Sequence, residues 1–188
     1  MKIVLKFGGT SLASPKDIRN VAKTITSFSK GNQIVVVCSA VDGVTDDLIT
    51  ISRLIEQRRK NNVVANLNGV IIKHRKLANQ TIKNSAVKKQ LLEKLNTDVS
   101  ELQELVRGLT LLKEVSARSL DYLISFGERL SDDLVSFALQ DLKKKSTALN
   151  GKEVGIVTDS NFGESRPLMD TTRIRISKTL GSLLSKKI

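Results

Sequence analysis

The chain has 188 residues and a formal net charge of +12, with 40% hydrophobic residues and one cysteine, Cys38. This length suits one domain or a large part of one, and the apolar fraction is sufficient for a hydrophobic core. No apolar run approaches the roughly 20 residues that a membrane-spanning helix needs, and a signal-peptide pattern is absent. One cysteine allows no internal disulfide bond, so we expect a soluble, cytoplasmic protein without a membrane partner.

The high positive charge makes nucleic acid one candidate partner. The basic residues lie in short clusters along the chain, and the aromatic residues, 3% of the total, are not interleaved with them. Stacking of bases on aromatic side chains is therefore not expected. We interpret the lysines as solvated helix faces and expect no nucleic-acid partner.

The first part of the sequence has the pattern of a strand, a helix and a second strand. The apolar run 3–7 predicts a strand, and Ser14 followed by Pro15 predicts a helix start, with apolar spacing that continues to Phe28. The β-branched run 34–37 predicts a second strand that is buried on both faces. Such a unit pairs its strands in parallel through a right-handed crossover.

The remaining sequence is mainly helical in pattern. Residues 61–118 are expected to form a lobe of two or three packed helices, which contains the only histidine, His74, at its surface. The apolar spacing predicts further helices over 45–60, 130–142 and 171–186, a short element at 120–125, and strand-like segments at 146–149 and 155–158.

The first predicted strand leads into Lys6-Phe7-Gly8-Gly9-Thr10-Ser11, just before the first predicted helix. Glycines let backbone N–H groups approach an anion, and a helix N-terminus adds partial positive charge. The loop matches neither G-x-x-x-x-G-K-[ST] nor G-x-G-x-x-G, so a simple tight turn is the alternative. Lys6 favours a phosphate site, because a lysine in a buried strand is costly unless it meets a negative charge.

Four segments spread over nearly the whole chain resemble, in order, the motifs of aspartate kinases in the amino-acid kinase superfamily. They are Lys6 to Ser11, Cys38-Ser39-Ala40-Val41-Asp42-Gly43-Val44-Thr45-Asp46, Phe126-Gly127-Glu128-Arg129-Leu130-Ser131, and Thr158-Asp159-Ser160-Asn161-Phe162-Gly163 with Arg166-Pro167-Leu168. The resemblance implies an α/β fold, a three-layer α/β/α sandwich with a mainly parallel sheet and a helical lobe at about 61–118. Residues 1–188 would be the N-terminal, amino-acid-binding part of the kinase domain.

An aspartate kinase transfers a phosphoryl group from MgATP to the side-chain carboxylate of L-aspartate, the first step of lysine, threonine and methionine biosynthesis. That carboxylate is already ionised at neutral pH, so the reaction needs no general base, and His74 lies away from every motif. The resemblance makes Lys6 the catalytic residue. It implies a phosphate-binding set of Lys6, Gly8, Gly9, Thr10 and Ser11.

The resemblance also implies that Ser39, Thr45 and Glu128 bind aspartate, with Glu128 pairing with the α-ammonium group. Each residue has a simpler alternative role. Ser39 would satisfy backbone groups at a strand end, Thr45 would cap a helix, and Glu128 would pair with Arg129 or Arg118. ATP and Mg²⁺ are the implied cofactors, and no protein residue is assigned as a metal ligand.

The family's Gly-Arg-Gly-Gly-Ser-Asp segment, its nucleotide-binding half and its regulatory ACT domains are absent from these 188 residues. We therefore expect little or no kinase activity from the chain alone, and either a homodimer or association with the missing C-terminal part. Two other functions remain open: another amino-acid kinase, acting on glutamate or acetylglutamate, and a non-catalytic amino-acid-binding or dimerisation module.

Overall fold

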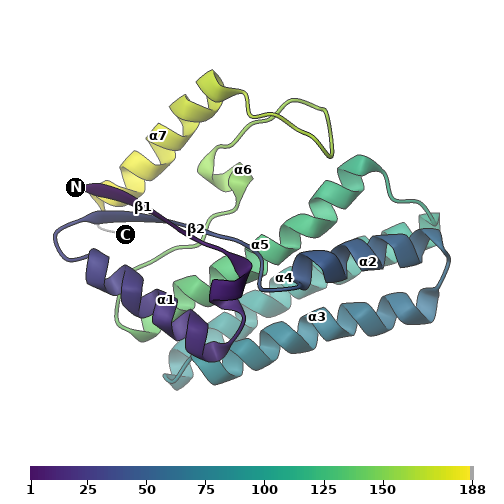
Figure 1. The fold of residues 1–188 in the computed structure, drawn as a ribbon, viewed down its shortest axis with the longest axis horizontal. Helices are drawn as coiled ribbons and strands as arrows, with labels where there is room; N and C mark the ends of the chain where they lie inside the picture. The colour runs from purple at the N-terminus through teal and green to yellow at the C-terminus, as the bar shows by residue number, and fades with distance from the viewer. Residues whose placement is uncertain (187–188) are drawn as a thin grey trace.

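The computed structural model describes residues 1–186 and places two strands among a series of helices (Figure 1). The elements, in chain order, are β1 (Lys2–Phe7), the 3-10 turn η1 (Gly9–Leu12), α1 (Pro15–Phe28), β2 (Gln33–Cys38), α2 (Val44–Glu56), α3 (Lys60–Thr81), α4 (Ser85–Leu112), α5 (Ala117–Asp141), α6 (Gly151–Val154) and α7 (Met169–Ser185). Within residues 1–186, no helix is both long enough and apolar enough to cross a membrane.

The predicted strand–helix–strand unit is confirmed. β1 and β2 pair in parallel, from Lys2 opposite Gln33 to Phe7 opposite Cys38. Between them, α1 begins as predicted, because the Ser14 side chain accepts a hydrogen bond from the Asp17 N–H and Pro15 occupies the first turn. Both strands therefore end at the same edge of the sheet, where the first two motifs follow.

The sheet lies between two helical layers, with α1 and α5 on one side and α7 on the other (Figure 1). The Gln33 side-chain amide donates to the Leu184 carbonyl at 3.0 Å and joins β2 to α7. The α/β fold with three layers is thus confirmed.

The prediction that 34–37 is buried on both faces is wrong. Val37 is 47% exposed and Val4 is 68% exposed. In the described part of the chain α7 reaches the sheet near Gln33 and leaves the other end of this face open. Lys6 is exposed on the same face, so the argument from a buried lysine fails, although its charge remains available.

The lobe consists of α3 and α4, which form a hairpin packed against α2 and α5 (Figure 1). The structure joins the predicted elements 120–125 and 130–142 into one helix, α5. The segments 146–149 and 155–158 form no strand: Thr158 makes an isolated bridge with Pro167. The short helix α6, which begins with an Asn150 capping box, comes between these two segments and ends at Gly155.

The expectation that His74 lies at the surface is also wrong, because its exposed fraction is 0%. Val70, His74 and Ala78 follow one another at four-residue intervals on the buried face of α3, whereas Arg75 and Lys76 point to solvent. The His74 Nδ1 atom bonds to the Val70 carbonyl at 2.8 Å. Burial lowers the pKa of His74 below its usual value of 6.5 and favours the neutral imidazole.

We expect His74 to reduce the unfolding free energy as the pH is lowered through 6.5, because the unfolded chain then binds a proton that the folded His74 resists. The contribution of His74 reaches at most about 2 kcal/mol at pH 5, since a displacement of one pH unit corresponds to about 1.36 kcal/mol. When urea unfolding at pH 8 and pH 5 is compared, the change in unfolding free energy should be less favourable by up to this amount in the wild type than in His74→Leu. Asp132 and Asp133, whose pKa values are raised, act in the opposite direction in both proteins, so the difference between the proteins is decisive. Parallel pH profiles would contradict this prediction.

Candidate functional site

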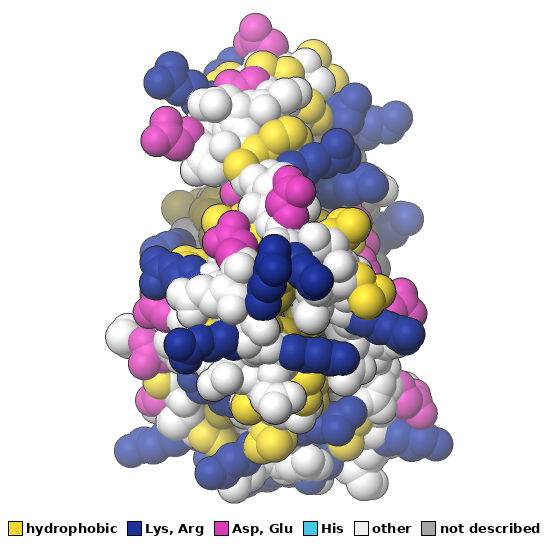
Figure 2. Space-filling model, turned by 90° about the vertical axis from the view of Figure 1, so that its right-hand side faces the viewer, with side chains coloured by type: hydrophobic (Ala, Val, Ile, Leu, Met, Phe, Trp, Pro, Cys, Tyr) yellow, Lys and Arg dark blue, Asp and Glu magenta, His cyan; other side chains and the backbone are white. Residues whose placement is uncertain are grey.

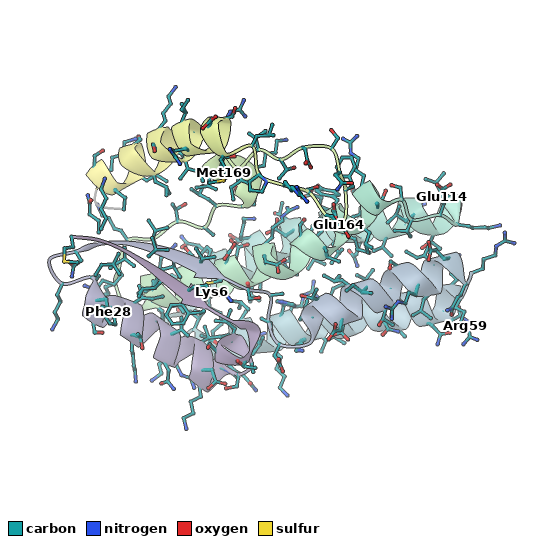
Figure 3. The ribbon with its side chains drawn as sticks, turned by 45° about the horizontal axis from the view of Figure 1, so that its top comes forward. Lys6, Phe28, Arg59, Glu114, Glu164 and Met169 are labelled. Carbon is teal, nitrogen blue, oxygen red and sulfur yellow. The ribbon has the colours of Figure 1, made fainter. Side chains whose placement is uncertain are left out.

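The first motif forms the loop that leaves β1. Lys6 lies on β1, close to the point where the strand leads into η1 (Figure 3). Its side chain is exposed, and no carboxylate of residues 1–186 lies within 4.0 Å of its ammonium group. Gly8 follows in an extended conformation, and its carbonyl accepts the Ser11 N–H at 3.0 Å. The loop therefore presents one cation without a bound counter-charge.

The two glycines of this loop have different surroundings. A Cβ atom at Gly9 would lie 2.9 Å from the Ala40 carbonyl oxygen and 3.4 Å from the Asp42 Cα. At Gly8 no described atom lies within 4 Å of that position. Gly9 is therefore needed where this loop packs against the second motif, whereas Gly8 leaves space for a ligand.

The second motif begins where β2 ends. The Ser39 N–H donates to the Phe7 carbonyl at 3.0 Å and its carbonyl accepts the Ser131 hydroxyl at 2.6 Å. The Ser39 hydroxyl itself makes no hydrogen bond with the described residues. The alternative role of this side chain, to hydrogen-bond backbone groups at the strand end, is therefore wrong. The hydroxyl remains free at the end of the sheet.

A tight turn then leads into α2. The Val44 N–H donates to the Val41 carbonyl at 3.0 Å, and Gly43 has φ 76° and ψ −10°. These angles are those of the third residue of a type II turn, which requires glycine. Gly43 is also the residue that caps α2, and Thr45 lies inside the first turn of the helix. The alternative role of Thr45 as a helix cap is therefore wrong.

The third motif lies within α5, where Glu128 is half-buried and has no ion-pair partner in residues 1–186. Its neighbour Arg129 points to α4, where it contacts Asp98 at 2.8 Å and Glu101 at 2.6 Å. The Arg118 guanidinium lies over the Phe162 ring instead. Both alternatives for Glu128 are thus contradicted, because the two arginines have other partners.

Two contacts fix α5 against the second motif. The Ser131 hydroxyl that donates to Ser39 also lies 2.9 Å from the Glu128 carbonyl. A Cβ atom at Gly127 would lie 2.8 Å from the Ala40 Cβ, so only glycine permits this approach. The contacts of Gly127 and Ser131, which flank Glu128 in the sequence, therefore fix this part of α5 against Ser39 and Ala40.

The sequence analysis missed Asp132, which follows Glu128 by one helical turn. Burial, together with the negative charges of Asp133 and Glu128, raises the pKa of Asp132 to about 7. Burial and the Asp132 carboxyl raise the pKa of the Cys38 thiol to about 12, so the thiol is protonated and hydrogen-bonds to Asp132. The sequence did hold a signal for this residue, because Asp132 follows Glu128 by four positions and residues at that spacing lie on the same face of a helix. Because its pKa is about 7, the Asp132 carboxyl is only partly ionised at neutral pH.

In the described part of the chain, the fourth motif forms no hydrogen bond or ion pair with the other three. Its Gly163 N–H donates to the Asp121 carboxylate at 2.8 Å, near the start of α5. Its own fold depends on Asp159, whose side chain accepts the N–H groups of Asn161 and Arg166. No three or more His, Cys, Asp or Glu side chains of residues 1–186 are grouped to hold a metal ion.

Three motifs therefore meet at one end of the parallel sheet, and comparison with known proteins identifies the class. The profile of the amino acid kinase family matches residues 1–187, and the chain belongs to this family. Aspartokinase 2, chloroplastic, of Arabidopsis thaliana is 30% identical over 184 residues, which are 98% of this chain and 32% of that protein. The aspartokinase of Corynebacterium glutamicum is 27% identical over 179 residues, 95% of this chain and 29% of the relative.

Solved structures show the same fold. The chain superposes on E. coli aspartokinase III in complex with aspartate and ADP with a TM-score of 0.86 and 21% identity, over 100% of this chain and 39% of the other. The same enzyme with lysine and aspartate gives a TM-score of 0.85. The chain thus spans about a third of the length of the curated relatives it matches.

We expect Gly9→Ala to destabilise the protein by about 1–3 kcal/mol, because its Cβ would be forced against the Ala40 carbonyl. Gly8→Ala is the matched control and should change stability by less than about 0.5 kcal/mol. Urea unfolding followed by circular dichroism measures both. Equal stability of the two variants would contradict the packing role of Gly9.

Proposed function

We propose that this chain is the amino-acid-binding part of an aspartate kinase. Its site, at the end of the parallel sheet, would bind L-aspartate beside the terminal phosphoryl group of MgATP. The observation that carries the proposal is that Lys6, Ser39, Thr45 and Glu128 belong to segments that pack against one another near the end of the sheet. Their polar side-chain atoms have no hydrogen-bond or ion-pair partner among the described residues.

The reaction would be a direct displacement at phosphorus. A side-chain oxygen of aspartate forms the new bond to the γ-phosphorus, and the bond to the β,γ-bridging oxygen breaks, with its electron pair leaving on ADP. No proton has to move, because aspartate reacts as the carboxylate. The Lys6 ammonium would offset the charge that develops on the transferred group. The open space beside Gly8 suits a phosphate oxygen.

The amino-acid end of the substrate would lie between α2 and α5. Glu128 is proposed to pair with the α-ammonium group, because its carboxylate has no ion-pair partner among residues 1–186. The free hydroxyls of Ser39 and Thr45 would hydrogen-bond the substrate. An amino acid with a negatively charged side chain suits this combination of the Lys6 cation, two hydroxyls and the Glu128 carboxylate.

The nucleotide would require residues beyond those described. Mg²⁺ commonly binds through phosphate oxygens and water with few protein carboxylates, so we propose that it arrives with ATP. The groups for the rest of the nucleotide would come from a C-terminal part, or from another chain in a dimer. The proposed setting is the cytoplasm, and the proposed product, aspartyl phosphate, starts the synthesis of lysine, threonine and methionine.

Calorimetry should show L-aspartate binding that Glu128→Gln weakens by roughly tenfold or more, because the charge-assisted hydrogen bond is lost without a change of shape. Glu104→Gln, on the exposed face of α4, is the control and should bind as the wild type does. L-Glutamate should bind more weakly than L-aspartate. Tighter binding of glutamate would favour another amino-acid kinase, and unchanged affinity in Glu128→Gln would contradict the assigned role.

Turnover tests the catalytic part of the proposal. In an assay coupled to ADP release, the chain alone should show little aspartate-dependent turnover, because the proposed nucleotide site is incomplete. Robust turnover would overturn that expectation. Lys6→Met should bind aspartate nearly as the wild type does. If Lys6→Met also keeps the turnover that the wild-type chain shows when it is combined with the C-terminal part, a non-catalytic module becomes the better description.

A further inference from the structure

The turn that precedes α2 has one peptide whose direction matters, the link between Asp42 and Gly43. The Val44-to-Val41 hydrogen bond and the positive φ of Gly43 define a type II turn. Asp42 is not among the residues with positive φ, which excludes the mirror-image type I′ turn. In types I and II the central peptide points in opposite directions, so a flip of this peptide would interconvert them.

A lysine of the helical lobe contacts that peptide. The Lys73 ammonium, which reaches across from α3, donates to the Asp42 carbonyl at 2.5 Å. It also lies 3.7 Å from the position that a Cβ atom on Gly43 would occupy. Lys73 is half-buried, and none of the carboxylates in residues 1–186 comes within 4.0 Å of its ammonium group. Among the described residues, the Lys73 ammonium group therefore bonds to a neutral backbone carbonyl, that of Asp42, and not to a carboxylate.

The contact determines where the other side of the peptide points. In a trans peptide the N–H is directed opposite to the carbonyl, so the Gly43 N–H points away from α3. This N–H donates no hydrogen bond to the described residues. It lies at the beginning of α2, where unpaired N–H groups and the helix dipole favour an anion.

We propose that Lys73 is a positioning residue, which holds the Asp42–Gly43 peptide so that the Gly43 N–H is available to a carboxylate of the bound amino acid. The identity of that ligand rests on the proposed function. With the peptide flipped, a carbonyl oxygen would replace the N–H and repel the carboxylate. A bound carboxylate would also offset the cost of placing an ammonium group near a helix N-terminus.

This role connects the helical lobe to the site. The lobe is built mainly from α3 and α4, whose buried residues are largely apolar, but Lys73 extends from α3 to the substrate side of the fold. A change in the tilt or register of α3 would move the ammonium group and release the turn. The lobe would thereby control affinity for the amino acid without contacting it.

The test compares Lys73→Met, which keeps the length of the side chain, with Lys73→Arg, which keeps a donor. Lys76→Met, on the exposed side of the same helix, is the matched control. Lys73→Met should weaken L-aspartate binding by roughly tenfold, the effect of losing one charge-assisted hydrogen bond. Lys73→Arg should restore the affinity to within about threefold, a difference of about 0.7 kcal/mol. Lys76→Met should leave it unchanged.

The NMR chemical shifts of the Gly43 amide and Cα provide a second readout, which needs no ligand. A flip of the Asp42–Gly43 peptide takes φ of Gly43 from positive to negative, so these shifts should move in Lys73→Met but not in Lys76→Met. Thermal unfolding of each variant establishes that the fold is intact.

The outcomes separate the two proposals. If the wild type does not bind aspartate, the proposed function fails, and the Gly43 chemical shifts still decide the role of Lys73. Unchanged Gly43 shifts in Lys73→Met overturn the inference. Unchanged aspartate affinity in a Lys73→Met variant whose Gly43 shifts have moved overturns it too, because the turn would then not govern binding.

Discussion

The packing of Ala40 between two glycines is the constraint on which the site depends. Ala40 is 3% exposed, with Gly9 against its carbonyl and Gly127 against its methyl group. A methyl group on either glycine would push apart the loop after β1, the end of β2 and α5. Because these three segments pack against one another, Lys6, Ser39 and Glu128 lie on neighbouring segments although they are far apart in the sequence.

Two adjacent charged residues of α5 have different surroundings. Arg129 lies over the Phe126 ring of its own helix and forms ion pairs with Asp98 and Glu101 of α4. Glu128, the residue before it, has no ion-pair partner among residues 1–186. Adjacent residues of one helix therefore differ: Arg129 fixes α5 to the lobe, whereas the Glu128 carboxylate is left without a counter-charge, as is the Lys6 ammonium group on β1.

Much of the framework was predictable from local chemistry. Ser14 and Pro15 predicted the start of α1, and a β-branched run predicted β2, because helix capping and strand propensity depend on residues that are close in the sequence. The surroundings of His74 and Val37 were not predictable, since burial depends on which distant elements cover a face. For the candidate site, the motifs nominated Ser39 and Glu128, but the different surroundings of Gly8 and Gly9, and the burial of Asp132 beside Cys38, depend on contacts that sequence spacing does not reveal.

The Ser131-to-Ser39 hydrogen bond joins residues 92 positions apart in the chain. Helices and helix hairpins form through local contacts, whereas closing such a long loop is entropically costly and slow. The lobe between these two residues can therefore collapse on its own before α5 meets the end of β2. A nascent chain would have to emerge beyond Ser131 before this hydrogen bond could form, so the end of β2 is joined to α5 only after the whole lobe between them has been synthesised.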